Sequence, residues 1–550
     1  MARPWLQLHP DDNLIVALSD LPTGYTLTVG NAFIQLQQAV AAKHKFTRTA
    51  VATGDLLTMY GVTVGKATEA LAPGTLVTTR NVAHATAAYG ATIGAPSWTP
   101  PDVSAYRNRH FEGYHRADGQ VGTANYWLII PLVFCENRNV AVLREALLEP
   151  LGYGQRRQQR YDITPLIRTY QAGGAAGEIL ATAAALPDEA SSPKRVFPHV
   201  DGIQFLTHEG GCGGTRQDAE TLCQLLAGYL CNPNVGGATV LSLGCQNAQI
   251  GLLRRCIDAI NPAFAKPLHI LEQQGGGSER EFIERALKLT FTGLMRINQT
   301  KRRPAPLSKL SLGLECGGSD GFSGISANPV LGHVSDMLVA LGGRAILAEF
   351  PELNGAEQEL VNRCTRPELA EKFMGLMRDY GSAAEAAGSG FAYNPSPGNI
   401  RDGLITDAMK SAGAARKGGT SPVTDVLDYA APATRPGLNL LCTPGNDVES
   451  TTGLAGSGAN LIAFTTGLGT PTGNPITPVI KVSSNHAVAE RLADLIDFDA
   501  GGVITGEQSV AGAGEALLDL LIEVASGRKQ TAARRLGQDD FIPWKRGISL

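Results

Sequence analysis

The feature that most constrains the fold is a regular alternation of short apolar runs with amphipathic segments, which begins near Tyr126. Most of the apolar runs end in Gly, Ser, Thr or Asn. Strand-length runs separated by helical patterns are typical of parallel strands joined by crossover helices. We therefore expect an α/β fold with mostly parallel sheets. The strands read YWLIIPLVF, VDGIQFLTH, GATVLSLG and PLHILEQQ, then LSLGLE, RAILAEF, LNLLCTPG, ANLIAFTTG and PVIKVSSN.

The first part of the chain has a different pattern. Between Asn13 and about Thr92, short β-type runs follow one another too closely for a helix to fit between them. We predict a small, mostly β domain there. The proline-rich stretch GAPSWTPPDV indicates a linker, and INQTKRRPAP indicates a second boundary. The predicted organisation is a β domain at 1–95, a linker at 96–112, a first α/β domain at 113–300 with an insertion at about 150–198, and a C-terminal α/β domain at 305–550.

Bulk properties exclude several classes of protein. The net charge of -4 and a charged fraction of 18% offer no basic surface for nucleic acid. No run approaches the roughly 20 apolar residues of a membrane helix, and the first residues lack a signal-peptide core. Nine scattered cysteines without a CxxC pair are typical of a reducing compartment, so we expect a soluble, cytoplasmic protein with a small organic acid as ligand.

Three cysteines lie among glycines where predicted strands end. They are Cys212 in THEGGCGG, Cys245 in LSLGCQNAQ and Cys316 in LSLGLECGG. Glycines at such positions let a ligand approach the backbone, so each thiol could reach a metal or a substrate. The alternative for each is a buried thiol that only packs. His208, four residues before Cys212, adds a possible nitrogen ligand.

Carboxylates and hydroxyls occur at similar strand ends. Glu315, Ser319 and Asp320 surround Cys316, and Glu349 and Glu352 follow the run RAIL. Thiolate and imidazole ligands suit Fe(II) or Zn, whereas carboxylates suit Mg or Mn, so both kinds of ligand are available. A bound divalent metal could help to remove a proton next to a carboxylate and to expel a hydroxyl.

Other segments allow two interpretations. The backbone around Thr465, Thr466 and Gly467 could hold a carboxylate or could form an ordinary turn. The basic triplet Lys43, His44 and Lys45 is either a solvated cluster or a loop that reaches into the neighbouring domain. The long segment 385–420, which is poor in apolar residues, is either a functional loop or a disordered one.

Several long motifs resemble the altronate and galactarate dehydratase family. They are AKHKF, GDLLTMYGVTVGKA, RNVAH, GYHRADGQVGTANYWLII, HEGGCG, NPNVGGATVLSLGC, ECGGSDGFSGISANP, NPSPGN, FTTGLGTPTG and VASGRK. The resemblance covers nearly the whole chain and implies an N-terminal β-clip (SAF) domain. PGNDVESTTGLAGSGANLIAFTTG and ILAEFPELNGAE resemble the altronate branch. That branch implies dehydration of D-altronate to 2-dehydro-3-deoxy-D-gluconate in hexuronate catabolism, with Fe(II), or Mn(II) as a substitute, and reduced thiols. We expect a homo-oligomer.

The resemblance implies site residues at His44, His208, Cys212, Cys245, Cys316 and Asp320. We combine these with the groups at strand ends. The predicted metal ligands are Cys212, Cys245, Cys316 and His208; the predicted catalytic residues are His44, His208, Glu349 and Asp320; and the predicted substrate-binding residues are Ser319, Thr465, Thr466, Gly467 and Asn125. The base remains open among His44, His208, Glu349 and Glu352. One departure from the family pattern is Gln246, which stands where a glutamate is expected and leaves one fewer anionic ligand.

Three alternatives remain at this stage. The same fold could dehydrate galactarate or act on a sulfonated hydroxy acid such as sulfolactate. The chain could instead be a sugar-acid binding protein with structural cysteines, because a fold alone does not establish chemistry. Finally, three thiols could hold an iron-sulfur cluster in place of a single iron, although we favour the single ion.

Overall fold

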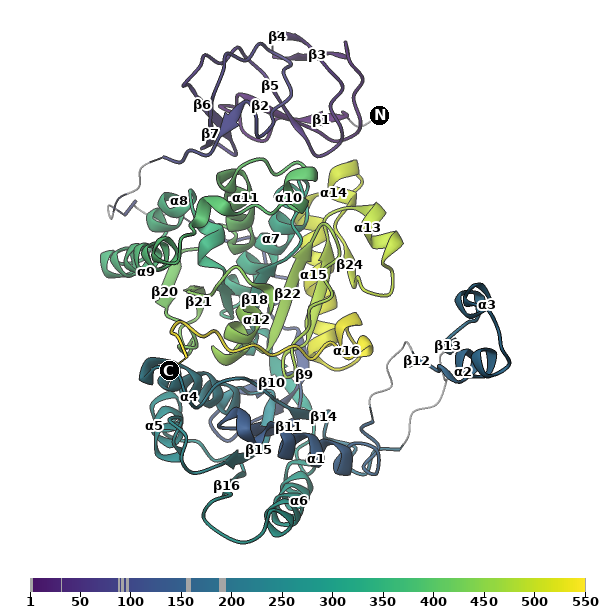
Figure 1. Cartoon of the computed structure of the whole chain (residues 1–550). Helices are drawn as coiled ribbons and strands as arrows, with labels where there is room; N and C mark the ends of the chain where they lie inside the picture. Colours follow the sequence, from purple (N-terminus) through teal and green to yellow (C-terminus); the bar gives the residue numbers. More distant parts are fainter. Residues whose placement is uncertain are drawn as a thin grey trace.

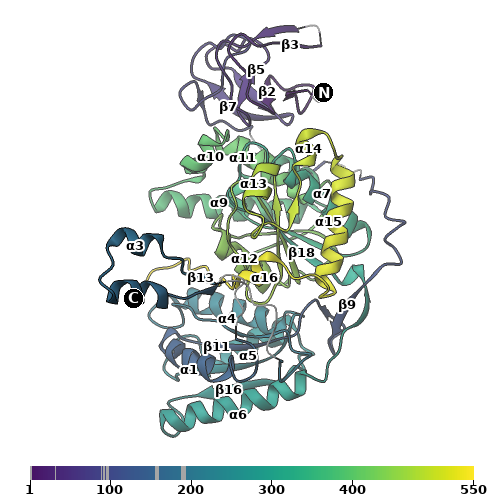
Figure 2. The ribbon, with the colours of Figure 1, turned by 90° about the vertical axis from the view of Figure 1, so that its right-hand side faces the viewer.

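The computed structural model describes residues 3–30, 32–87, 90, 93–94, 98–154, 160–186 and 194–549. Three bodies are stacked along one direction, with the N-terminal β domain at one end, the C-terminal α/β domain in the middle and the first α/β domain at the other end (Figures 1 and 2). The α/β class and the small β domain predicted from the sequence are confirmed. Within the described ranges, every helix is too short or too polar to serve as a transmembrane span.

The N-terminal domain consists of short antiparallel strands, as its closely spaced β-type runs predict. Two three-stranded sheets and a hairpin form it: β1 (Trp5–Leu6), β2 (Leu14–Ala17) and β5 (Lys45–Thr47); β6 (Leu56–Met59), β7 (Val62–Ala67) and β8 (Val82–Ala83); β3 (Thr26–Val29) and β4 (Ala32–Gln35). All four residues of β2 are buried. Side chains of this domain share an apolar core with the C-terminal domain, in which Met59 and Val64 join Phe322, Ile325 and Met409.

The first α/β domain contains a four-stranded parallel sheet. Its order is β14 (Gly202–Phe205), β11 (Tyr126–Pro131), β15 (Val235–Ser242) and β16 (Leu268–Glu272). All residues of β11 and β15 are buried, as expected for strands covered on both faces. The helices are α1 (Asn137–Leu147), α4 (Arg216–Cys231), α5 (Ile250–Ile260) and α6 (Glu279–Ile297). A short antiparallel sheet of β9 (His110–His115), β10 (Val121–Gly122) and β17 (Arg303–Pro306) connects this domain to the next.

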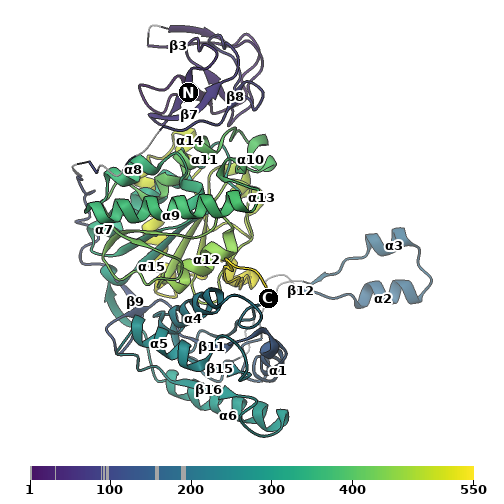
Figure 3. The same cartoon turned by 60° about the vertical axis from the view of Figure 1, so that its left-hand side comes forward.

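The predicted insertion forms a projecting arm. It contains β12 (Arg160–Tyr161), α2 (Thr164–Gln171), α3 (Ala176–Ala181) and β13 (Ala185–Leu186), and it extends away from the rest of the chain (Figures 1 and 3). Neither helix buries a residue. Large apolar side chains of the arm are exposed instead: Ile163, Ile167, Tyr170 and Leu180.

The C-terminal domain contains a seven-stranded parallel sheet. Its order is β20 (Val423–Leu427), β21 (Gly437–Leu441), β19 (Arg344–Leu347), β18 (Ser311–Cys316), β22 (Leu461–Thr466), β23 (Val479–Ser483) and β24 (Phe498–Asp499). The apolar core on one face includes residues of α7 (Ala327–Ala340), α9 (Pro367–Ala386) and α15 (Val510–Ala525). The core on the other face includes residues of α12 (Asp447–Gly456) and α16 (Ala532–Leu536). Shorter helices lie at the strand ends: α8 (Glu357–Asn362), α10 (Pro397–Arg401), α11 (Asp407–Ala414), α13 (His486–Arg491) and α14 (Gly502–Thr505); five 3-10 turns complete the fold at Phe134–Glu136, Leu307–Lys309, Phe350–Leu353, Phe391–Tyr393 and Ala415–Gly418.

The C-terminal tail links the two α/β domains. The backbone N–H groups of Arg546 and Gly547 donate to the Asp218 carboxylate of α4, both at 3.0 Å. Earlier in the tail, the Trp544 N–H donates to the hydroxyl of Tyr429, and the indole stacks on Tyr380 of α9. These contacts fix the tail along the boundary between the domains.

Candidate active site

The strand order of the seven-stranded sheet places the candidate site. From β18 the chain continues to β19 on one side, whereas β22 lies on the other side and leads to β23. In open α/β sheets, ligands bind outside the carboxyl ends of the strands where the order reverses in this way. Cys316 and Thr466 end β18 and β22, and Ser319 and Asp320 follow Cys316.

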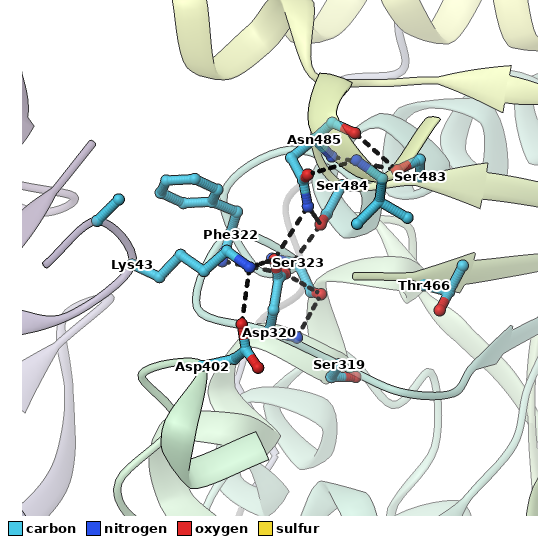
Figure 4. Close-up of polar contacts among 12 residues, drawn as sticks. Lys43, Ser319, Asp320, Phe322, Ser323, Asp402, Thr466, Ser483, Ser484 and Asn485 are labelled. Carbon is cyan, nitrogen blue, oxygen red and sulfur yellow. Dashed lines mark hydrogen bonds and ion pairs between the residues drawn. The ribbon is translucent and has the colours of Figure 1, made fainter. Parts of the chain in front are cut away.

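Asp320 is the centre of a polar network at this edge (Figure 4). Its fully buried carboxylate accepts hydrogen bonds from Ser323, from the Ser484 hydroxyl at 2.9 Å and from the Asn485 amide at 3.2 Å. Ser484 and Asn485 follow β23, so the network joins the ends of two strands. These donors fix the orientation of the Asp320 carboxylate at this edge of the sheet.

The N-terminal domain contributes a cation to the same network. The Lys43 ammonium lies 3.1 Å from the Asp320 carboxylate and 2.8 Å from that of Asp402 (Figure 4). Burial opposes the charge, but the two carboxylates outweigh it and raise the pKa of Lys43. The basic triplet is therefore a loop that reaches into the neighbouring domain. A cavity of about 500 Å³ lies beside Lys43 and Asp402, with Asn485 and His486 in its wall.

The two other residues of the triplet differ in their surroundings. The Lys45 side chain is fully buried and donates to the carbonyl of Gly403 at 2.6 Å. Burial lowers its pKa to about 7, against an opposing effect of Asp320. His44 is half-buried, and its Nδ1 lies 3.2 Å from the carbonyl of Ala42.

Beneath the edge lies a second group of charged side chains, which are buried. The Lys417 ammonium donates to the Cys316 sulfur at 2.8 Å and to Glu349 at 2.5 Å. Lys410 donates to Glu352 at 2.6 Å, and the Cys316 thiol donates to Glu352 at 3.3 Å. Both lysines come from the segment 385–420, which folds into short helices and supplies site residues.

Burial and mutual repulsion shift the protonation of this group. Burial raises the pKa of Glu349, with Lys417 opposing it, and burial and Glu349 together raise the pKa of Glu315. Glu352 behaves differently, because Lys410 and Lys417 outweigh the effect of burial and lower its pKa. One oxygen of Glu315 and one of Glu349 are buried without a hydrogen-bond partner. This group can therefore hold a proton on Glu349 or Glu315.

Three side chains of this group carry atoms that could bind a metal. Ligand atoms of Cys316, Glu349 and Glu352 lie within 4.8 Å of one another. The ammonium groups of Lys410 and Lys417 already contact all three side chains, so a divalent cation would lie beside two positive charges. The donors suit a metal, but the lysines occupy the positions a metal would need, and the group does not fit one.

The other predicted residues divide between the candidate site and the first α/β domain. Thr465 donates to Asn328 at 2.6 Å, the Thr466 hydroxyl accepts two backbone N–H groups, and Gly467 lines the cavity. Asn125 precedes β11 at the amino end of the other sheet, where its amide contacts Arg116 and two backbone carbonyls. It lies away from the candidate site.

His208, Cys212 and Cys245 belong to the first α/β domain, separate from Cys316. The His208 Nε2 donates to the carbonyl of Pro131 at 2.8 Å, and Nδ1 accepts the N–H of Gly210 at 3.1 Å. Neither nitrogen is free to bind a metal or a substrate, and burial lowers the pKa of His208 to about 4. Cys212 and Cys245 are both exposed.

Sequence reasoning missed four residues of the site: Lys45, Asp402, Lys410 and Lys417. Lys45 belongs to the basic triplet, of which only His44 was predicted as a catalytic residue. Lys410 and Lys417 lie seven residues apart, which is a helical spacing that could have indicated a common face. Asp402 had no signal in the sequence, because its partner Lys43 is 359 residues away.

Comparisons with known proteins agree with this organisation. Three family models match: the altronate/galactarate dehydratase SAF domain at residues 3–85, the D-galactarate dehydratase/altronate hydrolase second domain at 113–298, and the D-galactarate/altronate dehydratase C-terminal domain at 307–549. The chain is 34% identical to an altronate dehydratase of Escherichia coli, over 99% of this chain and 100% of the relative. It is 32% identical to an altronate dehydratase of Bacillus subtilis over 96% of both chains. Identity to the galactarate dehydratase (L-threo-forming) of E. coli is 28%, over 97% of this chain and 95% of the relative.

Proposed function

Because the chain belongs to the altronate and galactarate dehydratase family and is a hydro-lyase of sugar acids, we propose that it converts D-altronate to 2-dehydro-3-deoxy-D-gluconate and water. Higher identity to two altronate dehydratases than to the galactarate enzyme supports this choice of substrate. In the reaction, a base removes the proton next to the carboxylate and the neighbouring hydroxyl leaves with a proton as water. The resulting enol then tautomerises to the 2-keto acid.

The observation that carries the proposal is the meeting of buried lysines and carboxylates at the carboxyl edge of β18 and β22. Lys43 faces the cavity of about 500 Å³ and is the cation for the substrate carboxylate. Asp320 holds Lys43 in place, so it acts as a positioning residue. A site closed by the N-terminal domain also excludes water, which strengthens the electrostatic interactions inside it.

We propose Glu349 as the group that takes the proton. Its Oε1 is buried without a hydrogen-bond partner, whereas Oε2 is held by Lys417 and by the Cys316 N–H. Burial raises its pKa, so Glu349 holds a transferred proton more readily than an ordinary carboxylate does. His208, another predicted base, has no free nitrogen.

We also propose dependence on iron. A bound metal would supply Lewis acidity for the leaving hydroxyl. Since the lysines fill the group around Cys316, we place the iron at other residues, which are described in the next subsection.

The test is 2-keto acid formation by anaerobically purified, metal-stripped protein, with and without added Fe(II). D-Altronate, galactarate and sulfolactate are compared. Turnover of altronate only with iron supports the proposal, whereas turnover of galactarate or sulfolactate alone refutes the substrate. Tight altronate binding without turnover under any metal would favour the binding protein.

Variants then test the proton-accepting group. Glu349→Gln should abolish turnover, and Glu368→Gln, an exposed glutamate of α9, serves as the matched control. Full activity of Glu349→Gln would refute the role of Glu349 while leaving the substrate assignment intact.

A further inference from the structure

The exposed cysteines of the chain form a group of three. All nine cysteines are free, and Cys135, Cys212 and Cys245 are the exposed ones; the other six are buried or half-buried. Free cysteine is among the residue types most often buried, so three exposed thiols in one domain require an explanation. Cys135 had not been predicted as a site residue.

These three cysteines follow three neighbouring strands. Cys135 comes four residues after β11, Cys212 seven residues after β14 and Cys245 three residues after β15. The sheet order places β11 between β14 and β15, and all three strands are parallel. The thiols therefore lie at the same carboxyl edge of one sheet, where α/β proteins bind ligands.

Backbone hydrogen bonds hold the three loops together. The Phe134 N–H, next to Cys135, donates to the carbonyl of Gly210 at 3.1 Å. The Asn247 N–H, two residues after Cys245, donates to the carbonyl of Gly211 at 2.9 Å. The loop that carries Cys212 thus bridges the other two.

Gly211 makes this close approach possible. Its φ is +97°, and a Cβ there would lie 2.1 Å from the carbonyl oxygen of Leu132. A larger residue would push the Cys212 loop away from the loop that carries Cys135. The glycines around Cys212 therefore serve to bring backbones together.

The turn that carries Cys245 is fixed by Gln246. Its side chain accepts the Gly244 N–H at 2.6 Å and donates to the Ser242 hydroxyl, also at 2.6 Å. Gln246 is buried and fully engaged, so a glutamate is not needed there as a metal ligand. The Cys245 sulfur faces outward and accepts a hydrogen bond from Gln274 at 3.5 Å.

We propose that Cys135, Cys212 and Cys245 bind an iron-sulfur cluster through three thiolates. Thiolates alone select soft metals and iron-sulfur clusters. A single tetrahedral ion with bonds of about 2.3 Å would bring its sulfur ligands to about 3.8 Å from one another. The three sulfurs are not within 4.8 Å of one another, because the described residues contain only one such group, that of Cys316. Thiolates that bind different iron atoms of a cluster span a wider triangle.

The position of the proposed cluster relates it to the candidate active site. A catalytic role for the cluster rests on the proposed function. A cavity of about 520 Å³ lies beside Cys212, with Glu449 of α12 in its wall. Asp447, in the same first turn of α12, approaches Gly317 next to Cys316. The first turn of α12 therefore meets both the cavity beside Cys212 and the loop after Cys316. Three cysteines leave one iron of a four-iron cluster without a protein ligand, and such an iron supplies a Lewis acid.

The experiment measures cluster binding independently of turnover. The purified full chain is reconstituted anaerobically with ferrous and ferric iron and sulfide, and iron, sulfide, zinc and visible absorption are determined. We expect about four iron and four sulfide per chain with a brown colour in the wild type. Cys135→Ser, Cys212→Ser and Cys245→Ser should each lose most of the bound iron and the absorption.

Two control variants make the result specific. Cys256→Ser, on α5 of the same domain, and Cys316→Ser should both keep the iron and sulfide of the wild type. Loss of the cluster in Cys316→Ser with retention in Cys135→Ser would overturn the proposal, as would a colourless protein that binds one zinc. If the protein binds the cluster but does not turn over altronate, the proposed cluster site is supported and the proposed substrate is refuted.

Discussion

Removal of the Lys417 charge should destabilise the C-terminal domain strongly. The side chains of Lys417 and Glu349 are 1% and 0% exposed. Lys417 also donates a hydrogen bond to the Cys316 sulfur. In Lys417→Met, Glu349 and its neighbours lose this cation. Breaking a buried ion pair on one side costs about 3–5 kcal/mol, because an uncompensated charge remains. For a domain of this size, that loss lowers the melting temperature by roughly 6–20 °C.

Scanning calorimetry at neutral pH checks this expectation. Lys417→Met with Glu349→Leu should recover most of the lost stability, because replacing both partners of a buried pair with apolar side chains is often neutral. Lys288→Met is the surface control: Lys288 pairs with Glu284 on α6, both exposed, and its loss should cost less than about 0.5 kcal/mol. If Lys417→Met melts no earlier than Lys288→Met, the buried group is not held by charge and the electrostatic argument fails.

Three further predictions concern other parts of the chain. The pKa of Lys45 is about 7 when folded and 10.5 when unfolded, so the unfolded chain binds the extra proton between these values. Stability should therefore rise with pH across this window, and Lys45→Met should flatten the rise in melting temperature between pH 7 and pH 9; an unchanged rise would contradict the burial of a neutral lysine. Lys43→Ala removes the cation that faces Asp320 and should lower kcat/KM at least tenfold, whereas Lys66→Ala on the exposed side of β7 should not; equal activities would exclude Lys43 from substrate binding. Deletion of the arm at 160–186 should leave the melting temperature unchanged but lower the molar mass of the assembly measured by light scattering. The reason is that the exposed apolar side chains of the arm would bury about 1,000 Å² between two copies. An unchanged molar mass would show that the arm does not join copies.

The fold was predictable because its signals are local. Apolar runs that end at small residues predicted β15, β18 and β22, and the helical patterns between the runs correspond to helices such as α4 and α7. Part of the site was predictable for the same reason, since Asp320 and Glu349 directly follow strands. Asp402 was not predictable, because its partner Lys43 comes from a loop of another domain that folds over this edge.

The cysteines show that similar motifs in the sequence need not follow strands of the same sheet. Cys316 shares glycine neighbours with Cys212 and Cys245, and this local similarity suggested one site. Glycines beside a cysteine indicate that another group comes close to the backbone there. They do not indicate to which sheet the preceding strand belongs. The domain boundary between α6 and β18 separates Cys316 from the other two, and its thiol contacts Lys417. Cys135 has no glycine beside it, yet it follows the strand between β14 and β15. Strand order, a long-range property of the fold, therefore decides which thiols can bind one ligand.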